Sequence, residues 1–255
     1  MKKLLSIFFI CTLFFSCSKD TAVLEDALES STMSEANSKA KSKAKPNENN
    51  AFTEFKVTIT NLGGTEEYVN ILSPGTFVVQ KKNSAPLFMV GVEAGEGLEN
   101  LAEDGFPELL TMSLKNDPKV RSLGIFAIPV GDNAKGPIFP GDSYEFTITA
   151  KHNDFLNLAT MFVQSNDLFI SPDPEGIALF DSNKEPISGD ITSHFKLWDA
   201  GTEVNAEPGV GEFQKPRQPA PNTGPTENGV VHLVDDGFTY PNVSTIMSVV
   251  ISPIE

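Results

Sequence analysis

Cysteine is almost absent from this chain. Its 255 residues include only two, Cys11 and Cys17, and both lie near the N-terminus. The rest of the chain has no cysteine from which to build a disulfide framework, so its stability must come from packing or from a bound metal ion. Aromatic residues other than the 19 Phe are also few, with three Tyr and one Trp. This composition argues against the sugar-stacking cleft of a polysaccharide-cleaving enzyme.

Basic residues are outnumbered by acidic ones. The chain has 19 Lys and Arg against 34 Asp and Glu, which gives a formal net charge of −15 at pH 7. Such a field repels phosphate backbones and anionic membranes, so nucleic acid is not expected as a partner. It attracts cations instead, although acidity also serves solubility and does not by itself define a cation site.

No apolar run is long enough to span a membrane. The longest, residues 4–15, has about twelve residues, whereas a membrane-spanning helix needs about twenty. It follows Met1-Lys2-Lys3 and precedes Ser16-Cys17, which is typical of a secretory signal. A small residue directly before Cys17 resembles a bacterial lipobox; the alternative is an ordinary signal peptide with an incidental cysteine. We predict a signal peptide over 1–16 and lipidation of Cys17, which would hold the mature protein at the cell envelope, on the outer membrane or the cell surface.

Residues 17–51 have the composition of a tether. Between Ala36 and Asn50 the only apolar residues are Ala and Pro, so this segment cannot bury enough surface to offset the entropy of ordering. Its four alternating lysines either contact anionic lipid headgroups or serve as a solvated spacer. We predict a lipidated, disordered tether over 17–51 and one folded domain over 52–255.

The pattern changes to period two after the tether. In Phe55–Thr60 the apolar side chains occupy every second position, which indicates a strand with one buried face. Gly, Pro, Asn and Asp separate the further apolar segments, as in an antiparallel β protein. The other predicted strands are 76–80, 87–92, 124–130, 143–150, 159–164, 177–180, 194–198, 230–234 and 245–251. Short helices are predicted over 97–104 and 107–114, and a long Pro- and Gly-rich loop over 205–228. The sequence therefore predicts an all-β fold, an antiparallel β-sandwich with long loops.

Five segments occur in an order that resembles the spondin N-terminal domain family, in the form found on bacterial secreted proteins. They are Phe55–Asn61, Leu98–Gly105, Pro140–Ser143, Ala159–Asp167 and Trp198–Asn205. The resemblance extends over residues 52–251, and its most specific parts are Asp-Ala-Gly-Thr-Glu and the Ser-Asn-Asp that follows a hydrophobic strand. It implies an eight-stranded antiparallel β-sandwich of the type used by calcium-dependent membrane-binding domains. The helical pattern noted above adds one or two short helices in its loops.

The resemblance also implies a site for one calcium ion. In the animal members the ion is held by an Asp at a strand end and by both acids of the Asp-Ala-Gly-Thr-acid loop. These positions correspond here to Asp167, Asp199 and Glu203, with Glu203 in place of a second Asp. The animal proteins carry thrombospondin-type repeats and act in adhesion to extracellular matrix. Those repeats are absent from this chain, so the resemblance does not carry that biology over.

The residues themselves give a physical reason for such a site. Asp199 and Glu203 lie four apart around Ala-Gly-Thr, so a turn can direct both carboxylates to one point, and Asp167 would come from a separate strand end. Calcium takes six to eight oxygen ligands at about 2.3–2.6 Å, and Asn166, carbonyl oxygens and water would complete the shell. The alternative is a turn whose acids cap backbone amides. A second acidic group is expected to form a solvated helix end: Glu99, Glu103 and Asp104.

Other motifs predict no catalytic centre. The three histidines, His152, His194 and His232, lack metal-binding spacing, and the chain has no nucleophile elbow or phosphate-binding glycine loop. We therefore interpret the protein as a non-catalytic, calcium-binding module for binding or adhesion outside the cytoplasm, carried on a lipid anchor, with a protein or glycan ligand. Two alternatives stay open, namely a secreted polysaccharide hydrolase with a structural metal and a structural subunit of the envelope.

Overall fold

The computed structural model describes residues 51–64 and 66–254, which belong to a compact unit spanning Lys45–Glu255. The predicted signal peptide, the predicted lipidation of Cys17 and the tether up to residue 50 lie outside the described residues. Within the described part, no helix is both long and apolar enough to cross a bilayer.

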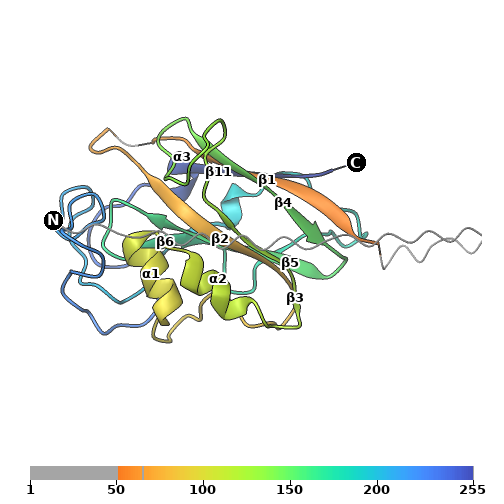
Figure 1. Cartoon of the computed structure of the whole chain (residues 1–255), viewed down its shortest axis with the longest axis horizontal. Helices are drawn as coiled ribbons and strands as arrows, with labels where there is room; N and C mark the ends of the chain where they lie inside the picture. The colour runs from red at the N-terminus through yellow and green to blue at the C-terminus, as the bar shows by residue number, and fades with distance from the viewer. Residues whose placement is uncertain (1–50, 65, 255) are drawn as a thin grey trace, which may run out of the picture. The chain divides into compact units, whose positions relative to one another are not determined.

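Two antiparallel β-sheets make up the domain (Figure 1). The smaller sheet contains, in spatial order, β4 (Ser143–Ala150), β1 (Thr53–Asn61), β11 (Met247–Pro253) and β8 (Gly189–Asp190). The larger sheet contains, in spatial order, β10 (His232–Leu233), β9 (Lys196–Asp199), β6 (Leu168–Ser171), β5 (Asp154–Phe162), β2 (Leu72–Lys81) and β3 (Val120–Phe126), with β7 (Ile177–Ala178) paired to β5.

The main core lies between the two sheets. In β1, Phe55, Val57 and Ile59 are fully buried, whereas Glu54 and Lys56 are exposed. Side chains alternate between the two faces of a strand, so every second residue of β1 reaches the core. The period-two pattern of the sequence therefore reports a sheet with one face in solvent.

A second core covers the outer face of the larger sheet. Phe77 and Val79 of β2 belong to the main core, while Val78 between them packs with the helical residues Leu98 and Leu101 on the other face. The described residues form three α-helices, α1 (Glu96–Asp104), α2 (Glu108–Leu114) and α3 (Val243–Ile246), and one short 3-10 helix at Thr192–His194. Because α1 and α2 lie over this face, the central strands are buried on both sides and lose the alternating pattern.

The end of α1 is fixed by a glycine. Gly105 has a φ of 68°, in the left-handed region, and its N–H donates to the Leu101 carbonyl oxygen at 2.9 Å. A Cβ at this position would lie 2.7 Å from the Cβ of Ser73, so the close approach to β2 also requires glycine. The carboxylates of the last helical turn are consequently held against the body of the domain.

The structure confirms the prediction of an all-β, antiparallel β-sandwich. The part of the chain that the structure describes has eleven strands, of which β7, β8 and β10 have two residues each. The predicted helices over 97–104 and 107–114 are confirmed as α1 and α2, and α3 is an addition. The predicted loop over 205–228 is also confirmed, since none of the strands includes these residues.

The prediction of a strand over 87–92 is wrong. Leu87 and Phe88 are buried in the second core, with the Phe88 ring centroid 4.9 Å from that of Trp198. Met89 and Val90 are exposed. The first half of the apolar run thus fills the outer face of the larger sheet, and the run forms no strand, although Gly91 and Val92 hydrogen-bond with the backbone of Val231.

Candidate metal centre

Two of the predicted ligands come from neighbouring strands of the larger sheet. β6 and β9 pair antiparallel with Leu168 opposite Asp199, so Asp167, directly before β6, lies beside Asp199 at the end of β9. Both residues are buried, with exposed fractions of 0% and 1%. The fold thus brings together two carboxylates that are 32 positions apart in the sequence.

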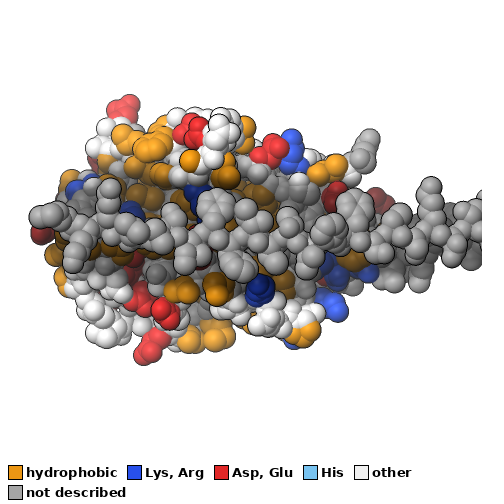
Figure 2. All heavy atoms as spheres, in the orientation of Figure 1, with side chains coloured by type: hydrophobic (Ala, Val, Ile, Leu, Met, Phe, Trp, Pro, Cys, Tyr) orange, Lys and Arg blue, Asp and Glu red, His pale blue; other side chains and the backbone are white. Residues whose placement is uncertain are grey.

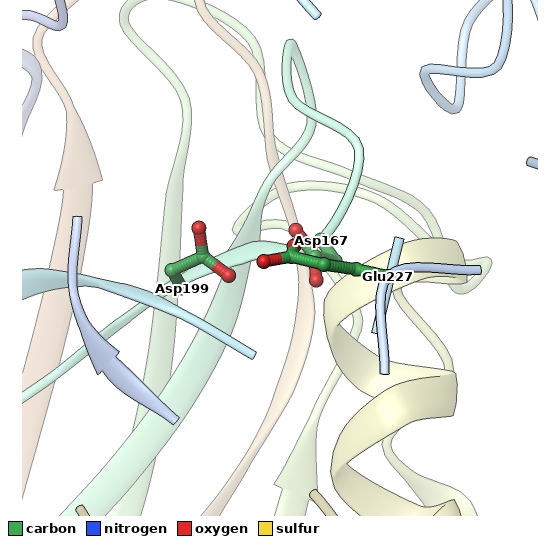
Figure 3. Close-up of side chains that lie close together, drawn as sticks. All are labelled: Asp167, Asp199 and Glu227. Carbon is green, nitrogen blue, oxygen red and sulfur yellow. The ribbon is translucent and has the colours of Figure 1, made fainter. Parts of the chain in front are cut away.

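A third carboxylate completes the cluster. One oxygen each of Asp167, Asp199 and Glu227 lie within 4.8 Å of one another, and Figure 3 shows the three side chains directed toward a common point. Asp167 and Asp199 are buried and Glu227 is exposed, so the cluster opens to solvent on the side of Glu227. We call these three residues the acidic triad.

The loop after β9 wraps around one oxygen of Asp167. Asp167 Oδ2 accepts hydrogen bonds from the Thr202 N–H at 2.7 Å, the Glu203 N–H at 3.0 Å and the Thr202 hydroxyl at 3.1 Å. Asp199 Oδ1 accepts from the Gly201 N–H at 2.7 Å, which closes a turn of the Asx type. The sequence Asp-Ala-Gly-Thr-Glu therefore folds around the carboxylate from the neighbouring strand.

Backbone pairing places Glu227. The segment around it runs antiparallel to the loop after β9, with the Glu227 N–H donating to the Thr202 carbonyl at 2.9 Å and the Gly229 N–H to the Gly201 carbonyl at 2.7 Å. Gly201 has a φ of 69°, and a Cβ on it would lie 2.7 Å from the Val230 nitrogen. Glycine at 201 is thus needed both for the turn and for the close approach of the returning segment.

Glu203, the third predicted ligand, lies outside the acidic triad. Its Oε1 accepts from the Gly224 N–H at 2.6 Å and its Oε2 from Asn166 Nδ2 at 3.1 Å. A Cβ on Gly224 would lie 2.1 Å from Glu203 Cδ, so the carboxylate is seated directly on the backbone there. Glu203 therefore holds the returning loop in place through Gly224, and the same loop contains Glu227.

Burial and mutual repulsion change the acidity of the triad. Burial, followed by the charge of Asp199, raises the pKa of Asp167 to about 8. Burial also raises the pKa of Asp199, against the opposing effects of the Gly201 N–H and of His232, whose Nε2 lies 4.0 Å from Asp199 Oδ2. The pKa of Glu227 is raised by burial and then by Asp199. Without a cation, Asp167 therefore retains a proton near neutral pH.

Two buried oxygens at the centre have no partner within the described residues. Asp167 Oδ1 is one, and the side-chain oxygen of Asn205 is the other. Asn205 is attached to the triad, because its Nδ2 donates to Asp199 Oδ2 at 2.6 Å. An unpaired buried carboxylate oxygen is costly, and a proton or a cation removes that cost. An oxygen-only donor set of this kind fits a hard cation such as calcium.

A second acidic group next to the triad is buried, contrary to the expectation of a solvated helix end. Glu103 and Asp104 have exposed fractions of 3% and 4%. Asp104 Oδ1 accepts from Gln218 Nε2 at 2.6 Å and from Lys215 Nζ at 3.2 Å. Burial, only partly offset by a hydrogen bond with Thr202, raises the pKa of Glu103 to about 7. The loop after residue 205 covers the end of α1, which the helical pattern of the sequence does not reveal.

Comparison with known proteins adds no family to this description. No protein-family model matches the chain, and no curated protein matches it. The interpretation of the acidic triad is therefore derived from its geometry.

Proposed function

We propose that this chain is a calcium-binding, non-catalytic module of the spondin N-terminal type, which acts in binding or adhesion at the cell envelope. In this proposal the domain is carried outside the cytoplasm on a lipid anchor at Cys17. The observation that carries the calcium part is the fully buried Asp167, which has one carboxylate oxygen without a partner among the described residues and belongs to a cluster of three carboxylates within 4.8 Å.

Calcium would act as a staple between three segments. Asp167 precedes β6, Asp199 ends β9, and Glu227 belongs to the loop that returns along residues 201–204. An ion bound to all three would cancel their repulsion and tie the loop to the larger sheet. With the dissociation constants of about 10⁻⁴–10⁻³ M that are typical of extracellular modules, about 10 mM calcium stabilises the folded state by about 1.4–2.7 kcal/mol.

Hydrogen bonding at the triad favours a structural role over catalysis. Asp167 Oδ2 receives three donors, and both oxygens of Asp199 receive one each. A carboxylate that acts as nucleophile or general base must present an oxygen to the substrate, whereas three of these four oxygens accept from the loop and the fourth, Asp167 Oδ1, is buried. The loop itself, which exposes residues such as Val210, is the surface proposed for ligand recognition.

Thermal unfolding tests the calcium part. In about 10 mM calcium the melting temperature should exceed that in chelator by about 3–10 °C, as expected for a domain of this size. Asp199→Asn should remove most of this difference, because it deletes one of the two buried charges. Equal melting temperatures in calcium and in chelator would refute the proposal.

Two further measurements test the remaining parts. The mass of the protein isolated from membranes should correspond to a chain that begins at an acylated Cys17, and an unmodified thiol there would reject the anchor. Incubation of the purified protein with a glycan panel separates a binding module from a hydrolase. Retention without cleavage supports the module, and turnover supports the hydrolase.

A further inference from the structure

Positive charge is concentrated at the end of the sandwich opposite the acidic triad. β5 runs from Asp154 to Phe162, and the triad lies beyond its C-terminal end. Around its N-terminal end lie five of the twelve Lys and Arg residues found between positions 51 and 254. We call these five residues the basic end: Lys81, Lys82, Lys119, Arg121 and Lys151.

Strand pairing brings the five residues together. β2 ends with Lys81, which pairs with Asp154 of β5, and its N–H donates to the Lys119 carbonyl oxygen at 3.2 Å. A shallow cavity of about 480 Å³ is lined by Lys81, Lys82, Arg121 and Lys151 together with His152, Asn153 and Asp154. Figure 2 shows Lys and Arg side chains gathered where β3 and β5 meet this end, while acidic side chains gather over α1.

The positive charge at the basic end is only partly compensated. Asp154 forms an ion pair with Arg121, and Asp117 accepts from the N–H groups of Lys119 at 2.8 Å and Ala85 at 3.4 Å. Among the described residues, Lys81, Lys82 and Lys119 form no ion pair. Asp173 and Glu175 line a groove with Lys81 and Lys82, and Asp173 forms an ion pair with Lys196. With Lys196 counted, six cations therefore face four anions, on a chain whose formal net charge is −15. Such a local excess of cations runs against the composition of the chain and attracts anions.

Exposed apolar side chains accompany the charges. Phe52 is 60% exposed, and its ring centroid lies 4.1 Å from Lys151 Nζ and 5.5 Å from the Arg121 guanidinium carbon. Met89 and Val90 are exposed as well, and they share a groove of about 570 Å³ with Lys81 and Lys82. Cations interleaved with exposed apolar groups match the headgroup region of a bilayer, where both kinds of side chain are stabilised. A soluble polyanion would stabilise the cations only.

We propose that the basic end docks onto the anionic headgroups of a phospholipid membrane. The chain enters the domain at this end, since Thr53 at the start of β1 pairs with Ala150, directly before Lys151. Only 34 residues separate Cys17 from Phe52, so a membrane that holds Cys17 is the nearest extended anionic surface. The choice of a membrane as the docking partner rests on the proposed lipid anchor at Cys17. The distribution of charge at the basic end is independent of that anchor. Docking would turn the acidic triad and its loop away from the membrane.

Vesicle sedimentation of the Lys45–Glu255 fragment tests this docking without the anchor. The fragment is a compact unit, and both cores consist of residues from Phe55 onward. In chelator and about 0.1 M salt, it should sediment with vesicles that contain about 30% phosphatidylglycerol and not with pure phosphatidylcholine. The triple variant Lys81→Glu, Lys82→Glu, Lys119→Glu should bind at least about 100-fold more weakly, from about fivefold per lysine.

A matched control uses a cation elsewhere on the surface. Lys82→Glu should weaken binding several-fold, whereas Lys135→Glu, which changes the net charge by the same amount, should leave it within about twofold. Lys135 is exposed and pairs with Glu108 of α2 at 3.2 Å. Circular dichroism melting of each variant verifies that it is folded.

Several results would overturn the proposal. These are no binding to anionic vesicles, equal binding to neutral vesicles, or an unchanged affinity of the triple variant. Retention on a sulfated polysaccharide column together with no vesicle binding would show that the basic end recognises a soluble polyanion instead. Because chelator is present throughout, failure of the calcium site does not affect this result. An unmodified Cys17 would remove the anchor but leave the vesicle result standing.

Discussion

At the scale of single residues, the two oxygens of Asp167 lie in different surroundings. Oδ2 accepts three hydrogen bonds from the loop after β9, and Oδ1, which is equally buried, accepts none from the described residues. An unpaired buried polar group costs about 1–3 kcal/mol, and more when it is charged. Asp167 therefore orders the loop through Oδ2, whereas a cation or a proton is needed to stabilise its unpaired Oδ1.

Asp167→Asn should act in opposite directions with and without calcium. The amide oxygen can take over the contacts of Oδ2, and the amide N–H can donate to Asp199 and thereby remove a repulsion. In chelator we expect a nearly unchanged free energy of unfolding near pH 7, where Asp167 is itself protonated, and one higher by about 1 kcal/mol above pH 8, where the variant lacks a buried like-charge pair. In calcium the stabilisation should disappear. Urea unfolding in both conditions measures this, and a retained calcium effect would contradict it.

Glu227→Gln and Glu203→Gln separate a ligand from a positioning residue. Gln at 227 should lower calcium affinity by about tenfold and leave stability in chelator nearly unchanged, because Glu227 is exposed. Gln at 203 would place an NH₂ group against Asn166 Nδ2. The Asn166 amide cannot turn over to accept from it, because Asn166 Oδ1 already accepts from the Ala206 N–H. It should lower stability in chelator by about 1–3 kcal/mol. Titration calorimetry and urea unfolding of both variants distinguish the roles, and the reverse pattern would restore Glu203 as the ligand.

The sequence predicts two of the three triad residues. Asp167 and Asp199 are identified by a motif, and the antiparallel register of β6 and β9 brings them together. Glu227 follows Glu203 by 24 positions in a Pro- and Gly-rich loop, so no local spacing marks it. Its place depends on backbone pairing with residues 201–204, and on Glu203 turning its carboxylate toward Gly224. These contacts depend on the tertiary structure, and no local sequence pattern indicates them.

At the scale of elements, predictability follows burial. β1 has one face in solvent, so its alternation is visible in the sequence. β5 is buried on both faces by the smaller sheet and by the helices, and only its second half is predicted. The apolar residues 87–92 satisfy the composition of a strand, yet Leu87 and Phe88 serve as a plug in the second core. Hydrophobicity shows that a segment is buried without showing what it pairs with.

Gly201→Ala tests how the loop is built. The residue has a positive φ, and a Cβ would press on the backbone of residues 229 and 230. The substitution should destabilise the domain by about 2–5 kcal/mol and abolish the calcium effect, since it displaces the segment that carries Glu227. Gly131 is the matched control, because it has a φ of 92° and a Cβ added there would meet no atom within 4 Å. Gly131→Ala should cost about 1 kcal/mol and keep the calcium effect. Equal effects of the two substitutions on thermal unfolding would contradict the proposed packing.

At the scale of the whole molecule, charge is separated along the sandwich. Carboxylates gather at one end, in the triad and at Glu103 and Asp104, and cations gather at the other. The net charge of −15 predicts cation binding but does not reveal this separation, because it is produced by the order of the strands. The net charge therefore predicts the binding of a cation such as calcium, but it does not reveal the local excess of cations at the basic end.

The acidic end predicts an unusual pH dependence in the absence of calcium. The folded-state pKa is about 8 for Asp167 and about 7 for Glu103, both above the ordinary values of 3.8 and 4.5. At pH values between the ordinary pKa and the folded-state pKa of each group, the folded state binds more protons than the unfolded state. The contribution of these groups to the free energy of unfolding is therefore present at low pH and is lost as pH rises toward 8. For Glu103 alone the change is about 3 kcal/mol across that window. Urea unfolding in chelator from pH 5 to pH 8 should show this decline, and Glu103→Gln should reduce it.

Calcium should oppose that decline, because the ion takes the place of the proton on Asp167. The calcium-induced rise in melting temperature is therefore expected to be larger at pH 8 than at pH 6. A calcium effect that is constant over this range would show that the buried carboxylates are not its source.

Location of the ion by X-ray diffraction from crystals grown in calcium tests the central claim most directly. We predict anomalous density for one calcium ion with oxygens of Asp167, Asp199 and Glu227 at about 2.3–2.6 Å, and with the Glu203 carboxylate still on the Gly224 N–H. No ion at the triad, or an ion held elsewhere with these three carboxylates turned apart, would contradict it.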